Sequence, residues 1–282
     1  DIGRDGDGTD DTGELDQSGD LTVESSGTLS SNQVGSGSGA APISIGGKLV
    51  VNSGQVNHSK TKLQVNTFSN DGTINLNGNE LEASGSLKCD NSQNGNNSSA
   101  TLDIGTGGTL DVNHSFTNGV NGSLDFANAT LELAGDFTNN GAFANSSSLA
   151  IFDGGFDSQK LGGTLTGGSG FIDFRIEDNG SGSPSVVVPD TKILVQGKLT
   201  VKSGSRFGSE SPQEDDDLRY EGSDFSADGD LFANVVEFAA DNVDTNTSPN
   251  TANSYTTVTG AVFAEVNVLN KTAIEVGSAS FT

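Results

Sequence analysis

The residues with the clearest chemical potential are acidic and lie near the start of the chain. Asp5, Asp7, Asp10 and Asp11 supply carboxylate oxygens at close positions, with glycines between them that permit sharp turns. Hard oxygen ligands on a turning backbone suit Ca²⁺. The segment lacks the positioned Glu that completes the common calcium loop, so a flexible acidic leader is the competing interpretation. Ca²⁺ is the one cofactor that the sequence suggests, and none is required. The acidic run at 214–217 is interpreted as a solvated loop.

Two other sets of residues invite a chemical interpretation. His58 and His114 occupy matching Asn-His-Ser triplets, but without Cys or a positioned carboxylate they fit surface turns better than a metal centre. Asp173 and Glu177 could serve as the two carboxylates of a glycoside hydrolase. Nothing in the sequence separates this pair from the other acidic residues, and no catalytic triad, P-loop or dinucleotide motif is present. We therefore expect no enzymatic activity.

Asparagines followed by any residue and then Ser or Thr are candidate N-glycosylation sites in a secreted protein. Many such triplets arise by chance in a chain this rich in Asn, Ser and Thr, and their use depends on the host. The candidates are Asn57, Asn96, Asn97, Asn113, Asn121, Asn128, Asn145, Asn179, Asn246 and Asn270.

Charge and cysteine content exclude several classes of protein. The chain has 38 acidic and 13 basic residues and a net charge of −25. Binding to nucleic acid or to an anionic membrane surface requires basic patches, so neither partner is expected. No apolar run is long enough for a transmembrane helix, so we expect no membrane insertion. Cys89 is the single cysteine, which excludes an internal disulfide and leaves a small buried or loop thiol as the simpler interpretation. A first residue other than Met is interpreted as a processed end, so we expect a secreted, extracellular or cell-surface protein.

Short alternating apolar and polar runs indicate strands with one buried face. Only 32% of the residues are hydrophobic, yet the β-forming residues recur in regular groups bounded by Gly, Asn, Ser or Asp, which disordered chains lack. Representative runs lie at 21–23, 48–51, 62–65, 73–76, 101–104, 109–112, 123–126, 130–133, 149–152, 171–174 and 198–201.

The spacing of similar runs predicts a repeat in the low twenties. Phe116 and Phe137 are 21 residues apart, and Phe68 and Phe116 are 48 apart, close to two such units. Short strands joined by tight turns at this period form the coil of a β-solenoid, whereas a sandwich has longer strands with Greek-key connections. We expect Leu131, Leu133 and Phe137 to face inward, with Asn139 and Asn140 at a corner that ends at Gly141. Asn residues of successive coils are expected to pair as ladders.

The segment LELAGDFTNNGAFANSSSLAIFDGGFDSQKLGG, at 131–163, resembles the repeat of secreted bacterial and archaeal surface β-helix proteins and adhesins, which read L-x-V-x-G-x-F-T-N-N-G-T-F. The same repeat pattern continues at 185–207, so the resemblance covers about 21–207. It implies an all-β parallel β-helix at a cell surface. It says little about activity, because such coils serve many roles.

We therefore predict an acidic leader at 1–20, a β-solenoid at 21–207, and a C-terminal β cap or assembly module at 208–282 with a short helix around Leu231–Ala240. The leading hypothesis is a non-enzymatic subunit of an extracellular filament, sheath or matrix, whose partners are other copies of itself. The joining strand would come from Tyr255–Thr282 or from the leader, by strand addition at an open edge. The alternatives are a monomeric adhesin that binds cell-surface glycans and a β-helix polysaccharide lyase or hydrolase.

Overall fold

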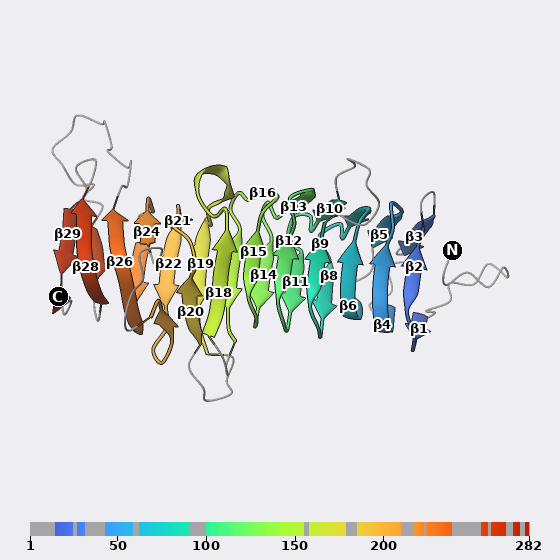
Figure 1. The fold of residues 1–282 in the computed structure, drawn as a ribbon, viewed down its shortest axis with the longest axis horizontal. Helices are drawn as coiled ribbons and strands as arrows, with labels where there is room; N and C mark the ends of the chain where they lie inside the picture. Colours follow the sequence, from blue (N-terminus) through green and yellow to red (C-terminus); the bar gives the residue numbers. More distant parts are fainter. Residues whose placement is uncertain are drawn as a thin grey trace. The chain divides into compact units, whose positions relative to one another are not determined.

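A computed structural model describes most of the chain, and it is built almost entirely of strands (Figure 1). The described residues are 15–24, 27–31, 43–58, 62–90, 100–154, 158–178, 185–209, 217–222, 224–238, 255–258, 261–268, 273–276 and 280–281. Outside them lie the calcium candidates Asp5, Asp7, Asp10 and Asp11, residues 214–216, and the glycosylation candidates Asn96, Asn97, Asn179, Asn246 and Asn270.

The chain divides into two compact units, Asp1–Ser148 and Leu149–Thr282. In the first, two parallel sheets alternate along the chain. The longer sheet holds β1 (Leu15–Gln17), β2 (Leu21–Val23), β4 (Ile43–Val51), β6 (Lys62–Asn70), β8 (Glu80–Ala83), β9 (Leu87–Cys89), β11 (Thr109–Val112), β12 (Phe116–Asn118), β14 (Thr130–Leu133) and β15 (Phe137–Asn139). The six-stranded sheet holds β3 (Thr28–Ser31), β5 (Gln55–His58), β7 (Thr73–Asn75), β10 (Ala100–Asp103), β13 (Gly122–Asp125) and β16 (Ala142–Ala144).

Strands pair in parallel with the equivalent strands of neighbouring coils, which confirms the predicted parallel β-solenoid. One row of paired residues runs Phe68, Leu87, Phe116, Phe137. Its intervals are 19, 29 and 21 residues, so the 48-residue spacing is two coils, as the sequence predicted. The longer coil accommodates residues 91–99 between Asp90 and Ala100 without disturbing the register.

The core consists of the inward positions of these strands. Leu131, Leu133 and Phe137 are each fully buried, which confirms the predicted inward face. Phe137 packs against Phe116 of the preceding coil with 5.5 Å between ring centroids. Each fully buried Leu or Phe side chain contributes about 1.5–3 kcal/mol to stability, so repeated stacking of the same positions compensates for the low hydrophobic content.

The predicted asparagine ladder is present, and it lies inside the solenoid. Asn118 and Asn139 end successive strands and are fully buried. The Nδ2 of Asn118 donates to Oδ1 of Asn139 at 2.8 Å and to the carbonyl of Ala142 at 2.8 Å. In an earlier coil, Nδ2 of Asn70 donates to the carbonyl of Thr101 at 2.7 Å. The corner itself is therefore made by Asn140 and Gly141, and the buried amides fasten it to the next strand.

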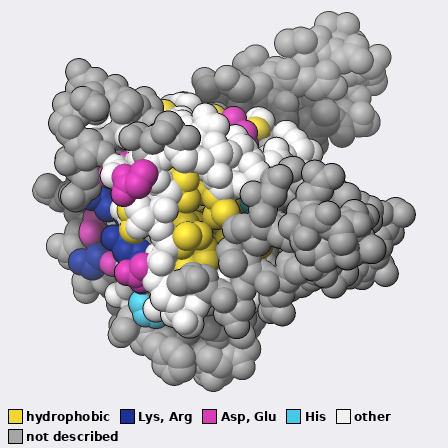
Figure 2. Space-filling model, turned by 90° about the vertical axis from the view of Figure 1, so that its right-hand side faces the viewer, with side chains coloured by type: hydrophobic (Ala, Val, Ile, Leu, Met, Phe, Trp, Pro, Cys, Tyr) yellow, Lys and Arg dark blue, Asp and Glu magenta, His cyan; other side chains and the backbone are white. Residues whose placement is uncertain are grey.

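The first strands of this unit expose part of its core. Leu21 on β2 and Leu29 on β3 are half-buried. Their partners one coil further on, Leu49 and Val56, are 0% and 2% exposed. Figure 2 views the protein from this side and shows hydrophobic side chains at the centre of the face, between atoms that are not described. The positions are the same, so the difference in burial arises from the coil stacked on the later strands.

The second unit is also built of strands that pair in parallel. It contains β17 (Leu149–Phe152), β18 (Ser158–Gly163), η1 (Gly167–Ser169), β19 (Asp173–Ile176), β20 (Val186–Pro189), β21 (Ile193–Val195), β22 (Lys198–Val201), β23 (Arg206–Phe207), β24 (Asp217–Tyr220), β25 (Asp224–Ala227), β26 (Asp230–Phe238), β27 (Tyr255–Val258), β28 (Ala261–Val268), β29 (Ala273–Val276) and β30 (Ser280–Phe281). Parallel pairs continue beyond Phe207, from β23 to β26, β28 and β30. The same pattern starts before Leu21, where β1 pairs with β4.

The predicted helix around Leu231–Ala240 is wrong, because Asp230–Phe238 forms strand β26. β26 begins beside β23 and ends beside β24, so it passes a corner of the coil. Leu231, Ala233 and Val236 are buried, and the change of phase after Ala233 interrupts the alternation. Two strand segments of opposite phase thus produce apolar spacings that resemble a helical period.

Candidate functional site

A row of acidic side chains on the outer face of the first unit is the strongest candidate for a ligand site. Alternation along β8 turns Leu81 inward and Glu80 and Glu82 outward. Parallel register then places Asp111 of β11 beside Glu82, and Glu132 of β14 beside Asp111. Carboxylate oxygens of Glu80, Glu82 and Asp111 lie within 4.8 Å of one another. Hard oxygen ligands at this spacing could hold a divalent cation.

A lysine already neutralises part of this row. Lys62 of β6 forms ion pairs with Glu80, at 2.9 Å, and with Glu82. The hydrogen bond to Glu82 raises the pKa of Lys62, and the same bond lowers the pKa of Glu82. Gln64 adds a hydrogen bond to Glu82 at 3.2 Å. A cation bound here would have to compete with Lys62, so the row is better explained as an ion-paired outer surface.

Two carboxylates meet at a corner of the first unit, a pair that sequence reasoning missed. Asp71 follows Asn70 and Asp90 follows Cys89, and these two preceding residues are paired in register. Burial, and then the charge of Asp90, raises the pKa of Asp71. Lys88 lies 3.4 Å from Asp90. Such a pair has the electrostatics of an acid–base site, but Asp71 is only 6% exposed, which leaves little surface for a substrate.

A second carboxylate pair lies in the second unit. Register between β17 and β19 brings Asp153 beside Glu177. Burial, and then the charge of Glu177, raises the pKa of Asp153. Both carboxylate pairs are brought together by the register between coils. The sequence does not show this register, because coil lengths vary.

The predicted hydrolase pair, Asp173 and Glu177, is not brought together. Four residues of extended strand separate two side chains by about 13 Å, more than the roughly 5–9.5 Å between glycosidase carboxyl groups. Oδ1 of Asp173 instead accepts a hydrogen bond from the backbone N–H of Lys198 at 2.7 Å. Asp20 accepts one from Lys48 at the same distance, so this is a recurring corner contact.

The remaining candidate residues are dispersed. His58 is buried in β5, whereas His114 is exposed in a turn, so the two histidines do not occupy equivalent environments. Cys89 is a free, fully buried thiol, as the simpler interpretation had it. Burial raises its pKa to about 11. Among the described glycosylation candidates, Asn113, Asn121 and Asn128 are exposed, and Asn57 and Asn145 are half-buried.

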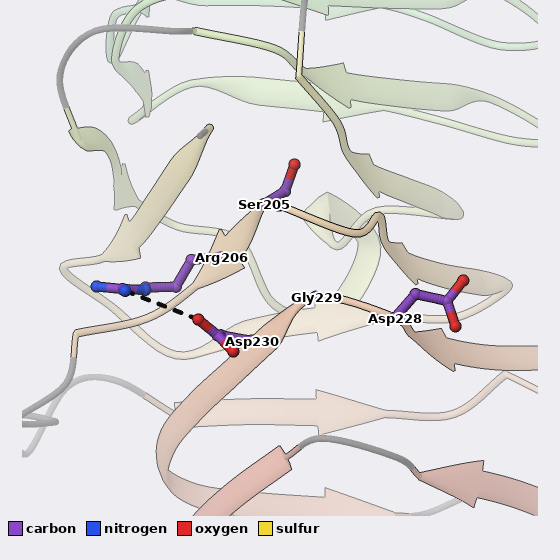
Figure 3. Close-up of a pocket in the computed structure, with 6 residues that line it drawn as sticks. Ser205, Arg206, Asp228, Gly229 and Asp230 are labelled. Carbon is purple, nitrogen blue, oxygen red and sulfur yellow. Dashed lines mark ion pairs between the residues drawn. The ribbon is translucent and has the colours of Figure 1, made fainter. Parts of the chain in front are cut away.

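A polar cavity of about 290 Å³ in the second unit was also missed by sequence reasoning. It is lined by Gly204, Ser205, Arg206, Asp228, Gly229 and Asp230. Figure 3 shows Arg206 and Asp230 directed toward one another, with 3.7 Å between Nη2 and Oδ2, while Ser205 and Asp228 point elsewhere. Arg206 also lies over the ring of Phe232, 5.4 Å from its centroid. The side chains do not converge on a common point, as a catalytic site requires.

Comparisons with family models, curated proteins and solved structures gave no match to this chain. Within the described part of the chain, no helix is long and apolar enough to span a membrane.

Proposed function

We propose that this protein is a non-enzymatic structural subunit that stacks on further copies of itself through its strand edges, in an extracellular filament, sheath or matrix. The observation that supports the proposal is the half-buried apolar edge formed by β2 and β3. Leu21 and Leu29 occupy ladder positions that are fully buried wherever another coil lies against them. A second copy that adds a strand there would bury the same positions.

Backbone geometry supports the same partner. The N-terminal strands pair with β4 and β5 in parallel, and at the other end of the chain β28 pairs with β30 in parallel. An edge strand offers N–H and C=O groups to an added strand. Joining the last strand of one copy to the first strands of the next is a head-to-tail contact, which generates an open polymer rather than a closed dimer.

Charge determines the conditions under which such a contact forms. Copies with a net charge of −25 repel one another at long range. Salt screens exposed charges over about 10 Å at 0.1 M ionic strength, while the apolar contact at the edge is not weakened by it. Assembly is therefore expected to increase with salt concentration.

Sedimentation velocity and negative-stain microscopy over a range of protein and salt concentrations test the proposal. Leu29→Lys places a charge in the apolar edge and should abolish polymers. Thr28→Lys adds the same charge on the exposed face of the same strand and should leave them intact. Leu29→Ala, a milder change, should weaken assembly, and thermal unfolding of each variant separates loss of contact from loss of fold. The proposal would be contradicted if the protein stays monomeric at every protein and salt concentration. It would also be contradicted if Leu29→Lys and Thr28→Lys change polymer formation equally.

Deletion of residues 255–282 tests the C-terminal half of the contact, since unchanged polymers would exclude a role for these strands. A glycan array run on the same material distinguishes the adhesin alternative, which requires monomers with discrete glycan binding. Release of product from neutral or acidic polysaccharides would favour a lyase or hydrolase instead.

A further inference from the structure

The described residues include four Asn–Gly steps, at Asn77, Asn118, Asn121 and Asn140. In an Asn–Gly sequence, the backbone nitrogen of the glycine can attack the side-chain amide of the asparagine. The glycine has no side chain to hinder this attack. The reaction needs a glycine N–H that is not engaged in a hydrogen bond and a side-chain amide free to turn toward it. The four Asn–Gly steps differ in how far the fold meets these two conditions.

In three steps, the glycine N–H donates a backbone hydrogen bond. Gly78 donates to the carbonyl of Ile104 at 3.0 Å, Gly119 to that of Cys89 at 2.8 Å, and Gly122 to that of Gly119 at 2.8 Å. Gly141 is different: among the residues that the structure describes, its N–H has no acceptor.

The four asparagine side chains also differ in burial and in the hydrogen bonds that hold their amides. Asn118 is fully buried and its amide donates to Asn139 and Ala142. The amide of Asn77 donates to the carbonyl of His58 at 2.9 Å. Asn77, Asn121 and Asn140 are all exposed. Of these four steps, only that of Asn140 combines an exposed amide with a glycine N–H that has no acceptor among the described residues.

The corner at Gly141 differs from the corresponding corner of an earlier coil in the donor that the buried asparagine oxygen accepts from. At the corresponding corner of an earlier coil, Gly72 N–H donates to Oδ1 of Asn70 at 2.9 Å. Asn139 holds the place of Asn70, but its Oδ1 accepts from Nδ2 of Asn118 at 2.8 Å. The asparagine oxygen thus accepts from the glycine in the earlier corner and from the asparagine of the preceding coil in this one.

We propose that Asn140 is a site of self-modification by deamidation. The nitrogen of Gly141 bonds to Cγ of Asn140, the Cγ–Nδ2 bond breaks, and ammonia leaves with the proton from the glycine nitrogen. Water then opens the cyclic imide at either carbonyl, giving aspartate or isoaspartate. Isoaspartate lengthens the main chain by one methylene at the corner before β16, where Ala142 pairs with Ser123. The product also carries a new negative charge.

Peptide mass spectrometry of the folded, unglycosylated protein after incubation at mildly alkaline pH tests the proposal. Asn121 is the internal control, because it is the same dipeptide with an exposed side chain and differs in the bonded glycine N–H. One net hydrogen bond corresponds to roughly a fivefold rate difference, so Asn140 should convert at least that much faster. In urea the two rates should become similar.

Asn140→Gln should remove the fast phase, because attack on the longer side chain requires a larger ring, while Asn121→Gln should leave it unchanged. Comparable conversion of Asn121 and Asn140 in the folded protein would overturn the proposal. So would a ratio between them that is unchanged by unfolding, since the difference would then belong to local sequence and not to the fold.

Discussion

The buried asparagine ladder makes a specific prediction at Cys89, which interrupts it. The row runs Asn70, Cys89, Asn118, Asn139 in consecutive coils. Because cysteine cannot donate a strong hydrogen bond forward, Oδ1 of Asn118 is buried with no hydrogen-bond partner among the described residues. The contacts of the thiol with Nδ2 of Asn70 and with the carbonyl of Ala100 are both long, at 3.6 Å.

We expect Cys89→Asn to stabilise the protein. The new amide would donate to Oδ1 of Asn118 as Asn118 donates to Asn139, removing an unsatisfied buried acceptor that costs about 1–3 kcal/mol. Burial of an amide in place of a thiol of similar volume has a desolvation cost that offsets part of this gain. The net stabilisation should be about 1 kcal/mol. At about 2–4 °C per kcal/mol, the midpoint of thermal unfolding should rise by a few degrees.

Two control variants isolate the donated hydrogen bond. Cys89→Asp has nearly the same shape as asparagine but brings only acceptors, and as an ionised group it should destabilise the fold by about 3–5 kcal/mol. Cys89→Ala leaves Asn118 unchanged and opens a small cavity, with a loss of about 1 kcal/mol. The reasoning is refuted if differential scanning calorimetry finds Cys89→Asn no more stable than Cys89→Ala.

Three further predictions follow from burial and close approach. Burial raises the pKa of the Cys89 thiol from near 9 to about 11, so the thiol should resist alkylation in the folded protein. Stability should therefore fall as pH rises from 9 to 11, with a contribution from Cys89 of at most about 3 kcal/mol. Urea unfolding at each pH checks this, and the stability of Cys89→Ala should fall less steeply over the same range. Burial and Asp90 favour the protonated form of Asp71, so this residue opposes folding at neutral pH and ceases to do so as pH falls through its raised pKa. Asp71→Asn should therefore stabilise the protein at pH 7 but hardly at pH 3, and equal effects at both would exclude an electrostatic cause. A Cβ at Gly122 would overlap Oδ1 of Asn118 and lie 2.5 Å from the carbonyl oxygen of Cys89, so Gly122→Ala should cost about 1–3 kcal/mol of stability or more. Gly168→Ala, whose Cβ has no atom within 4 Å, is the matched control in thermal unfolding.

The architecture was accessible from the sequence because it depends on local repetition. Recurrence of Phe with Asn two residues later predicted the coil, and the strand alternation predicted which side chains face inward, including Leu131 and Phe137. The asparagine ladder followed from the same recurrence. Each of these features is repeated in one coil after another, so a pattern in the chain reports it.

Most of the errors and omissions concern features that depend on how coils are aligned. Strand β26 was predicted as a helix because a corner inside the strand shifts the phase of its buried residues after Ala233. The proximity of Asp71 to Asp90, and of Asp153 to Glu177, depends on register between coils of unequal length. The separation of Asp173 from Glu177 follows from strand geometry once β19 is placed. Sequence spacing alone carries no information on the distance between Asp71 and Asp90 or between Asp153 and Glu177.

The unequal coils of the first unit also bear on how such a protein can change over generations. Coils of 19, 29 and 21 residues keep one row of core residues in register, and the additional residues of the longest lie between strands. Lengthening a connection costs only a slowly growing closure entropy, whereas a single residue inserted within a strand reverses every side chain beyond it. Insertions at corners are thus nearly neutral, and new peptide segments can be acquired or lost there while the stacked interior is inherited unchanged.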